Sequence, residues 1–174
     1  MDAAARFDKL EKEFVHEWAL RNPTIGTALG MHDECDDRMP DGSYAKLQDD
    51  IRFLRRYEAE FAQLDGKKLA LNREIDRDLA ISQIHAWLFD LEELRYWESS
   101  PEAPHVLGEA IFQLLSRNYE PLAARLRSIM KRLEALPAYL EQTKSKLRTP
   151  VKMFVENELE TLTRFPGFFN TLKD

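Results

Sequence analysis

Glycine is scarce in this sequence, with 6 residues among 174, and runs of β-branched residues are few. Hairpins and strands need both, because tight turns favour glycine and strands favour valine, isoleucine and threonine. The composition therefore leaves little room for a β-sheet. Hydrophobic residues make up 44% of the chain and charged residues 32%, a balance typical of a globular domain with a core. We predict an all-α protein that folds as a single helical domain over residues 1–174.

Cysteine occurs once, at Cys35. A lone cysteine excludes an internal disulfide, and chains without disulfides are typical of reducing compartments. The N-terminal segment MDAAARFDKLEKEF is charged and has no apolar stretch of the kind that signal peptides carry. We therefore expect a cytoplasmic protein.

Long apolar runs and an excess of positive charge are also missing. No apolar stretch approaches the roughly 20 residues that span a bilayer, so we expect no membrane partner. The formal net charge is −6. Proteins that bind nucleic acid need a clustered basic surface to neutralise phosphates, so we expect no nucleic-acid partner. None of these features sets an oligomeric state.

Catalytic motifs are absent as well. His16-Glu17 begins like the zinc motif His-Glu-x-x-His, but Leu20 stands where the second histidine belongs. The sequence contains no Gly-x-Ser-x-Gly elbow, phosphate loop, dinucleotide fingerprint or cysteine pair. We therefore expect no catalytic residue and no cofactor within this chain.

What the sequence does contain is helical periodicity. Residues Asn72–Trp97 include neither glycine nor proline, and apolar residues recur there every three or four positions. Asn72 suits an N-cap, because its side chain can accept a hydrogen bond from a free amide of the first turn. A second apolar set widens the stripe beyond one face, which is typical of a helix with neighbours on two sides. We predict a bundle of about six or seven helices around a central helix at Asn72–Trp97.

Prolines, glycines and polar caps mark the limits of the other helices. The first helix ends before Asn22-Pro23, because a residue that precedes proline avoids the helical region. Pro121 suits a first turn, whereas Pro137 either kinks that helix or starts a successor. The basic stretches 125–132 and 144–148 are interpreted as solvated helix faces. The helices expected on this basis cover about 3–21, 44–64, 104–116, 121–136, 138–148 and 151–165.

The end of the chain, FPGFFNTLKD, is rich in phenylalanine, with Phe165, Phe168 and Phe169 close together. Such a segment either packs back on the core or continues into a part of a longer protein, because exposed apolar patches often mark an interface. Both possibilities stay open at the level of the sequence.

Residues Thr24–Ser43 form the one long segment that we expect to be irregular, after a possible short turn of helix at Thr24–Leu29, since glycines and a proline interrupt it. It holds an imidazole, a thiol and four carboxylates in the run HDECDD at 32–37. The alternating acids, the glycine and the closing glutamate of an EF-hand are missing, so a solvated acidic loop is one interpretation and a metal site a less favoured one. Long loops are also often functional. The candidate residues of a substrate-cleft loop are His32, Asp36, Asp37 and Asp41.

Two Glu-x-x-His motifs occur, at Glu13–His16 and at Glu102–His105. Positions three apart share a helix face, and two such pairs with two further carboxylates hold two metal ions in ferritin-like bundles. Pro104 lies inside the second motif, and no convincing pair of partner carboxylates interrupts an apolar face. Solvated ion pairs are the simpler interpretation, and a di-metal bundle is kept as an alternative.

Two segments together resemble a known family. NPTIGTALGMHDECDDRMPDGS combines a Pro-x-x-x-Thr-x-x-Gly run with His32, a group of acids and Ser43 at the start of a helix. EIDRDLAISQIHAWLFDLEELRYWESSP begins with Ile-Asp-Arg-Asp-Leu and ends in Glu-Leu-x-x-Trp. With the later ARLRSIMKRLEALPAYLEQTKSKLRTP, this pattern resembles the N-terminal region of the bacterial family called Domain of Unknown Function 885, over nearly the whole chain.

The resemblance implies a relation to mostly helical zinc metallopeptidases. Their metal motif, a His-Glu followed by a further histidine, belongs to a C-terminal half, so no catalytic residue carries over to this chain. The resemblance implies a non-catalytic N-terminal region that serves as scaffold and wall of a substrate cleft. Its partner would be the C-terminal catalytic half of the same polypeptide, with zinc in that parent protein and a peptide as substrate. The alternative is a free-standing helical module that binds a partner or a small ligand.

Overall fold

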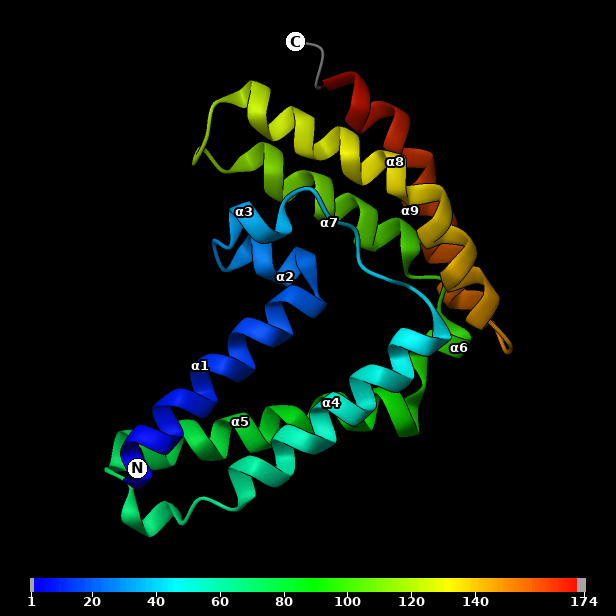
Figure 1. The fold of residues 1–174 in the computed structure, drawn as a ribbon. Coiled ribbons are helices and arrows are strands. Elements are labelled where there is room, and N and C mark those ends of the chain that lie inside the picture. Colours follow the sequence, from blue (N-terminus) through cyan, green and yellow to red (C-terminus); the bar gives the residue numbers. More distant parts are fainter. Residues whose placement is uncertain (1, 172–174) are drawn as a thin grey trace.

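The computed structural model describes residues 2–171, which are helical without any strand (Figure 1). Three short helices and two single turns connect six longer helices within this range. The long helices are α1 (Ala3–Arg21), α4 (Tyr44–Ala62), α5 (Leu71–Phe89), α7 (Ala103–Ser116), α8 (Leu122–Lys146) and α9 (Lys152–Thr171). The short elements are α2 (Pro23–Ala28), α3 (His32–Cys35), the 3-10 turn η1 (Gly66–Lys68), the π-helical turn η2 (Asp90–Leu94) and α6 (Tyr96–Ser99). The prediction of an all-α bundle is confirmed.

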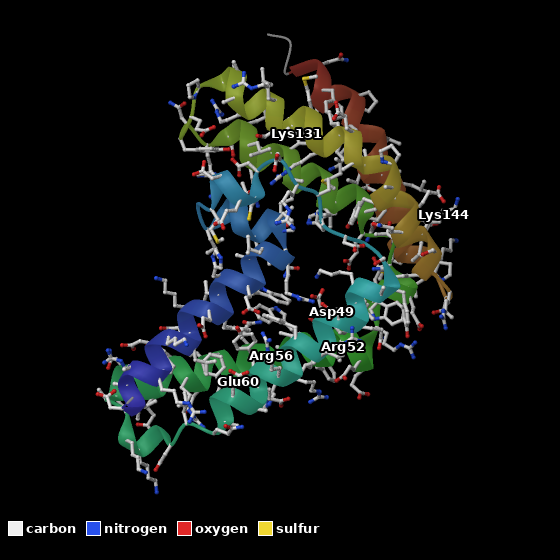
Figure 2. The ribbon with its side chains drawn as sticks, viewed as in Figure 1. Asp49, Arg52, Arg56, Glu60, Lys131 and Lys144 are labelled. Atoms are coloured by element: carbon white, nitrogen blue, oxygen red, sulfur yellow. The ribbon has the colours of Figure 1, made fainter. Side chains whose placement is uncertain are left out.

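Helices α1, α4 and α5 enclose the first of two apolar clusters. Its buried residues recur at helical spacing on each helix, which is why these segments fold as amphipathic helices. The opposite face of α4 is charged, and Figure 2 shows Asp49, Arg52, Arg56 and Glu60 along it. Arg52 pairs with Asp49 at 3.0 Å, one turn apart on the exposed surface. The buried members of the cluster are Phe7, Leu10, Phe14, Phe53, Leu54, Tyr57, Phe61, Leu64, Leu69, Ile84 and Leu88.

The prediction of one central helix at Asn72–Trp97 needs correction. The N-cap is Ala70 rather than Asn72, and the α-helix ends at Phe89, followed by the π-helical turn. Arg95 then adopts a left-handed conformation with φ 51°, which stops the helix and turns the chain into α6. Trp97 Nε1 donates to the Leu91 carbonyl oxygen at 2.9 Å and satisfies an acceptor at this break.

The flanks of α5 also differ from the expectation. Ile84 and Leu88 are buried against α1 and α4. The N-terminal half instead leaves a row of apolar side chains open to solvent, with Leu71 72%, Ile75 49% and Leu79 61% exposed. Periodicity identifies the apolar faces of a helix, but it does not reveal whether a neighbour covers each face. Helix α5 therefore has α1 and α4 as neighbours, but one apolar row of its N-terminal half remains exposed.

Helices α7, α8 and α9 form the second apolar cluster, around Leu107, Ile111, Leu114 and Ile129. The phenylalanines of the chain end pack against it, since α9 continues through Pro166 to Thr171 rather than ending near residue 165. Helix α8 likewise continues through Pro137. An interior proline removes one helical hydrogen bond and costs about 3 kcal/mol. Packing on both sides of each proline offsets this cost, through Leu133, Leu136 and Tyr139 on α8 and Phe165, Phe168 and Phe169 on α9.

The segment Thr24–Ser43 contains two short helices. The first lies at the possible helical turn of Thr24–Leu29, and the second, α3, was not expected. Pro23 opens α2, and α3 follows after a turn at Gly30, whose φ is 86°. Helix α2 contacts α1 and α7, and α3 contacts α1 and α2, so Thr24, Thr27 and Cys35 are buried where a solvated loop was expected, whereas Asp33 and Glu34 are exposed. Residues 29–31 form the turn between these helices, and residues 36–43 form a linker that runs past α8 to the start of α4 (Figure 1). The Gly42 N–H donates to Gln142 Oε1 of α8 at 3.0 Å.

Gly26 provides a test of how tightly α2 packs. A Cβ atom there would collide with Cys35 Sγ and would lie 3.1 Å from the Ala19 carbonyl oxygen. Both neighbours are fully buried. We expect Gly26→Ala to lower the free energy of unfolding by about 1–3 kcal/mol, because overpacking forces neighbouring atoms apart. Urea denaturation followed by circular dichroism measures this change.

Gly167 is the matched control for that substitution. It lies in α9, and a Cβ atom added there would have no other atom within 4 Å, so an alanine meets no obstacle. Gly167→Ala should raise the free energy of unfolding by about 0.5–1 kcal/mol, because alanine loses less backbone entropy in a helix. Equal effects of the two substitutions would contradict the close packing of α2 against α3.

Candidate functional site

A buried polar network joins α2 and α3 to the second cluster, with Asp36 at its centre. The Asp36 side chain is 7% exposed. Thr27 Oγ1 donates to Asp36 Oδ1 at 2.8 Å, and the Tyr119 hydroxyl donates to Asp36 Oδ2. His32 Nδ1 lies 3.1 Å from Asp36 Oδ2, one helical turn away on α3. The carboxylate is thus held by three side chains from different parts of the chain.

His32 is fixed by a second contact. Its ring stacks on Tyr119 with centroids 3.4 Å apart and planes inclined by 3°. Burial and the hydrogen bond to Asp36 raise the pKa of the Tyr119 hydroxyl, so this group stays a neutral donor. A histidine oriented by a buried carboxylate can act as a general base. Within residues 2–171, no hydroxyl or thiol forms a hydrogen bond with His32, whose contacts are the Asp36 carboxylate and the Tyr119 ring.

Arg132 of α8 completes the network and is fully buried. Its guanidinium donates to Thr27 Oγ1 at 2.6 Å, to the Cys35 carbonyl oxygen at 3.2 Å and to the Ala110 carbonyl oxygen. Burial lowers the pKa of Arg132, while the negative charge of Asp36 opposes that shift. Arg132 therefore ties α8 to α2, α3 and α7 at one point.

The interpretation of residues 125–132 as a solvated basic face is wrong at two positions. Arg125 is also buried and donates to the carbonyl oxygens of Leu114 and Leu115 at 2.9 Å each, which satisfies free acceptors at the end of α7. The burial of these two arginines could have been predicted from their spacing along the helix, although not from the number of basic residues. Arg125, Ile129 and Arg132 lie four and three positions apart, so the two arginines share a helix face with a core residue.

The four candidates for a cleft loop are only partly brought together. His32, Asp36 and Asp37 line a surface cavity of about 350 Å³ between α3 and α8. Lys131 of α8 (Figure 2) closes one side and donates to Asp37 Oδ2 at 2.7 Å, which lowers the pKa of that carboxyl. Asp41 lies apart from them, because it accepts from the Ser43 backbone N–H at 2.8 Å at the start of α4.

The two Glu-x-x-His motifs do not converge. Glu13 pairs with Lys9 at 3.6 Å on the surface of α1, and His16 faces Glu34 at 3.8 Å. Glu102 and His105 lie at the start of α7, where Glu102 lines another cavity. Among residues 2–171, no three histidine, cysteine, aspartate or glutamate side chains are grouped so that they could hold a metal ion. The arrangement expected for a di-metal bundle is therefore not formed in this range.

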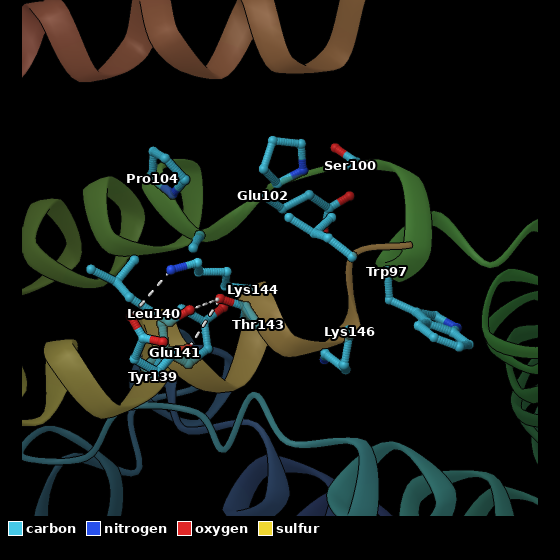
Figure 3. Close-up of a pocket in the computed structure, with 13 residues that line it drawn as sticks. Trp97, Ser100, Glu102, Pro104, Tyr139, Leu140, Glu141, Thr143, Lys144 and Lys146 are labelled. Atoms are coloured by element: carbon cyan, nitrogen blue, oxygen red, sulfur yellow. Dashed lines mark hydrogen bonds and ion pairs between the residues drawn. The ribbon is translucent and has the colours of Figure 1, made fainter. Parts of the chain in front are cut away.

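A second cavity, of about 330 Å³, lies where α6, the start of α7 and the end of α8 meet (Figure 3). Sequence reasoning missed it, because its walls come from segments that are far apart in the chain. Its lining mixes aromatic, proline and aliphatic side chains with a few charged ones. The main lining residues are Trp97, Pro101, Glu102, Pro104, Tyr139, Leu140 and Lys146.

Helix α8 also presents an uncovered apolar stripe, defined by Leu122, Leu126 and Met130. These side chains are 53%, 42% and 60% exposed and follow one another at intervals of four residues. Such spacing places them in one row on the helix surface. Together with the open row on α5, the α8 stripe is apolar surface that no part of residues 2–171 covers. No helix in that range is both long and apolar enough to cross a bilayer.

Comparison with known proteins supports the fold and the family. No curated protein matches the chain. A solved structure described as "a putative lipoprotein of unknown function from Shewanella oneidensis" superposes with a TM-score of 0.78 at 23% sequence identity. The likeness covers 87% of this chain and 28% of that protein, and at this identity it shows the fold alone. The family model of bacterial proteins of unknown function, DUF885, matches residues 23–173. The predicted resemblance is thereby confirmed, and the chain belongs to the bacterial protein family DUF885.

Proposed function

We propose that this chain is a non-catalytic helical region of a longer DUF885 polypeptide, in which it serves as scaffold and as one wall of a substrate cleft. The observation that carries the proposal is the α8 stripe of Leu122, Leu126 and Met130. Monomeric domains seldom leave a contiguous apolar row open, and such rows usually mark an interface. The proposed occupant is the remainder of the same polypeptide. The Shewanella structure supports this choice, since the shared fold spans only 28% of that protein.

The chemistry of the longer protein is a separate part of the proposal. The resemblance to helical zinc metallopeptidases supports a zinc-dependent peptidase-like activity with a peptide substrate. We place the zinc and the hydrolytic residues in the C-terminal part of the polypeptide, because the family resemblance locates the metal motif there. Residues 2–171 then contribute shape and rigidity, with the Asp36 network bracing the wall.

An immunoblot of cells that carry the native gene tests whether a longer polypeptide exists. An antibody raised against this chain should detect a band well above 20.4 kDa, about three times that mass. Fractionation of the same lysate tests the compartment. We propose the cytoplasm, which the buried free thiol of Cys35 supports, whereas the Shewanella protein is described as a lipoprotein. If the immunoblot showed the native protein at 20.4 kDa, no further part of the polypeptide would be present to cover the α8 stripe.

A substitution in the stripe tests the proposed docking. Met130→Glu should change the free energy of unfolding of this chain by less than about 0.5 kcal/mol, because the side chain is exposed. In the longer polypeptide the same change would bury an unpaired charge and should lower the Tm by several degrees. Differential scanning fluorimetry of both proteins measures this contrast.

Ala135→Glu is the matched control, since it introduces the same charge at an exposed position on another face of α8. It should leave the Tm of both proteins unchanged. Equal effects of Met130→Glu in the short and the long protein would show that the α8 stripe is not covered.

A further inference from the structure

The cavity at the junction of α6, α7 and α8 has walls suited to an apolar group. Trp97 is held in place by its hydrogen bond to the Leu91 carbonyl oxygen, and Tyr139 is 7% exposed. Pro101 and Pro104 also line the cavity. Proline and oriented aromatic side chains lose little conformational entropy when a ligand binds, so these walls are largely preformed. The volume of about 330 Å³ falls in the range of small-molecule sites.

Two opposite charges line the same cavity without pairing. Glu102 precedes α7 and Lys146 ends α8, so they reach the cavity from different segments (Figure 3). They attract each other, although Glu158 and His105 act more strongly on Glu102 and Asp41 acts more strongly on Lys146. Neither side chain forms a hydrogen bond or an ion pair within residues 2–171. Desolvation raises the pKa of Glu102 and lowers that of Lys146, because each charged group has lost part of its water. At the rim, by contrast, Lys144 and Glu141 lie 3.7 Å apart as a pair.

This arrangement selects the kind of ligand. A purely anionic molecule would meet the Glu102 carboxylate, and a purely cationic one would meet the Lys146 ammonium. An uncharged apolar molecule would fill the walls but would form no hydrogen bond with either charged group, which is costly in a partly desolvated site. A molecule with both charges and an apolar body satisfies all three features at once.

We propose that this cavity binds a free α-amino acid with an apolar side chain. Its ammonium group contacts Glu102, its carboxylate contacts Lys146, and its side chain packs against Trp97 and Tyr139. The inference does not rest on the proposed docking of the chain, because every group that it uses belongs to residues 97–147.

Isothermal titration calorimetry of the purified chain tests the proposal, with L-phenylalanine and L-leucine as probes. We expect saturable binding with a Kd of about 1 mM or tighter. Three comparators each lack one feature of the ligand. N-acetyl-L-phenylalanine has no ammonium group, L-phenylalaninamide has no carboxylate, and glycine has no apolar side chain. Each should bind at least about tenfold more weakly, because a group in the cavity then loses its partner.

Two variants assign the contacts. In Glu102→Gln, L-phenylalanine and N-acetyl-L-phenylalanine should bind with similar affinity. In Lys146→Gln, L-phenylalanine and L-phenylalaninamide should bind with similar affinity. Lys144→Gln, at the rim, should bind L-phenylalanine like the unmodified chain. Circular dichroism confirms that each variant is folded before titration.

Three results would overturn the proposal. The first is the absence of saturable binding of either amino acid up to about 10 mM, ten times the upper limit expected for Kd. The second is equal affinity for L-phenylalanine and all three comparators. The third is that the folded variants Glu102→Gln and Lys146→Gln still bind L-phenylalanine as much more tightly than N-acetyl-L-phenylalanine and L-phenylalaninamide as the unmodified chain does.

Discussion

Arg132→Ala should lower the free energy of unfolding by about 3–5 kcal/mol, one of the two largest effects that we expect in this protein. The substitution removes a fully buried guanidinium that donates to Thr27, Cys35 and Ala110. It removes one donor from each of these acceptors, although the Cys35 carbonyl oxygen keeps the Arg38 N–H, and it removes a buried positive charge that acts on the Asp36 carboxylate. Urea denaturation monitored by circular dichroism measures the loss.

Two further variants separate the causes of that effect. Arg132→Lys keeps the positive charge but lacks the planar fork that reaches three acceptors, so its loss should fall between those of the alanine variant and the unmodified chain. Arg127→Ala removes an exposed arginine from the same helix and should cost less than about 0.5 kcal/mol. A loss below about 1 kcal/mol for Arg132→Ala would show that the buried network contributes little to stability.

Phe14→Ala is the second large effect, with an expected loss of about 3–5 kcal/mol. Phe14 is 6% exposed, and its ring lies within 6.3 Å, centroid to centroid, of Phe53, Tyr57, Phe61 and Trp87. Alanine would leave a cavity between α1, α4 and α5 and would remove four aromatic contacts. The measurement is urea denaturation, with near-ultraviolet circular dichroism to follow the packing of the remaining rings.

Val15→Ala is the control for Phe14→Ala, because Val15 is the next residue of α1 and is 46% exposed. It should change the free energy of unfolding by less than about 0.5 kcal/mol. If the two variants were equally stable, the three helices would not be held together around the face of α1 that carries Phe14.

The helix limits that are best predicted from the sequence are those marked by a proline or by a capping side chain. Helix α1 ends before Asn22-Pro23, and the Ser43 side chain caps α4 by accepting the Lys46 N–H at 3.1 Å, both as expected. The errors arise where tertiary packing overrides a local rule. Pro137 and Pro166 lie inside helices because apolar contacts on either side offset the lost hydrogen bonds. Helix α5 is apolar on more than one side, yet one row has no neighbour within the described residues.

The candidate site is predictable from the sequence only in part. His32 and Asp36 are four residues apart, so their proximity follows from one helical turn. Tyr119 lies 83 residues from Asp36 in the sequence, and Arg132 lies 105 residues from Thr27. A local sequence pattern does not predict contacts over such separations. The α6–α7–α8 cavity depends in the same way on two distant segments. Proximity in sequence groups Asp41 with His32, but the linker carries Asp41 away to α4.

The two apolar clusters do not merge into one core, and the Asp36 network stands between them. Apolar surfaces tolerate small rotations against each other, because dispersion and hydrophobic contacts depend little on direction. Hydrogen bonds weaken steeply once the donor angle is lost. The directed hydrogen bonds of the Asp36 network, together with the Gly42–Gln142 bond and the Arg117–Ala28 bond, therefore contribute to the angle between α1, α4 and α5 and the helices α7, α8 and α9 in a way that the two apolar cores alone do not.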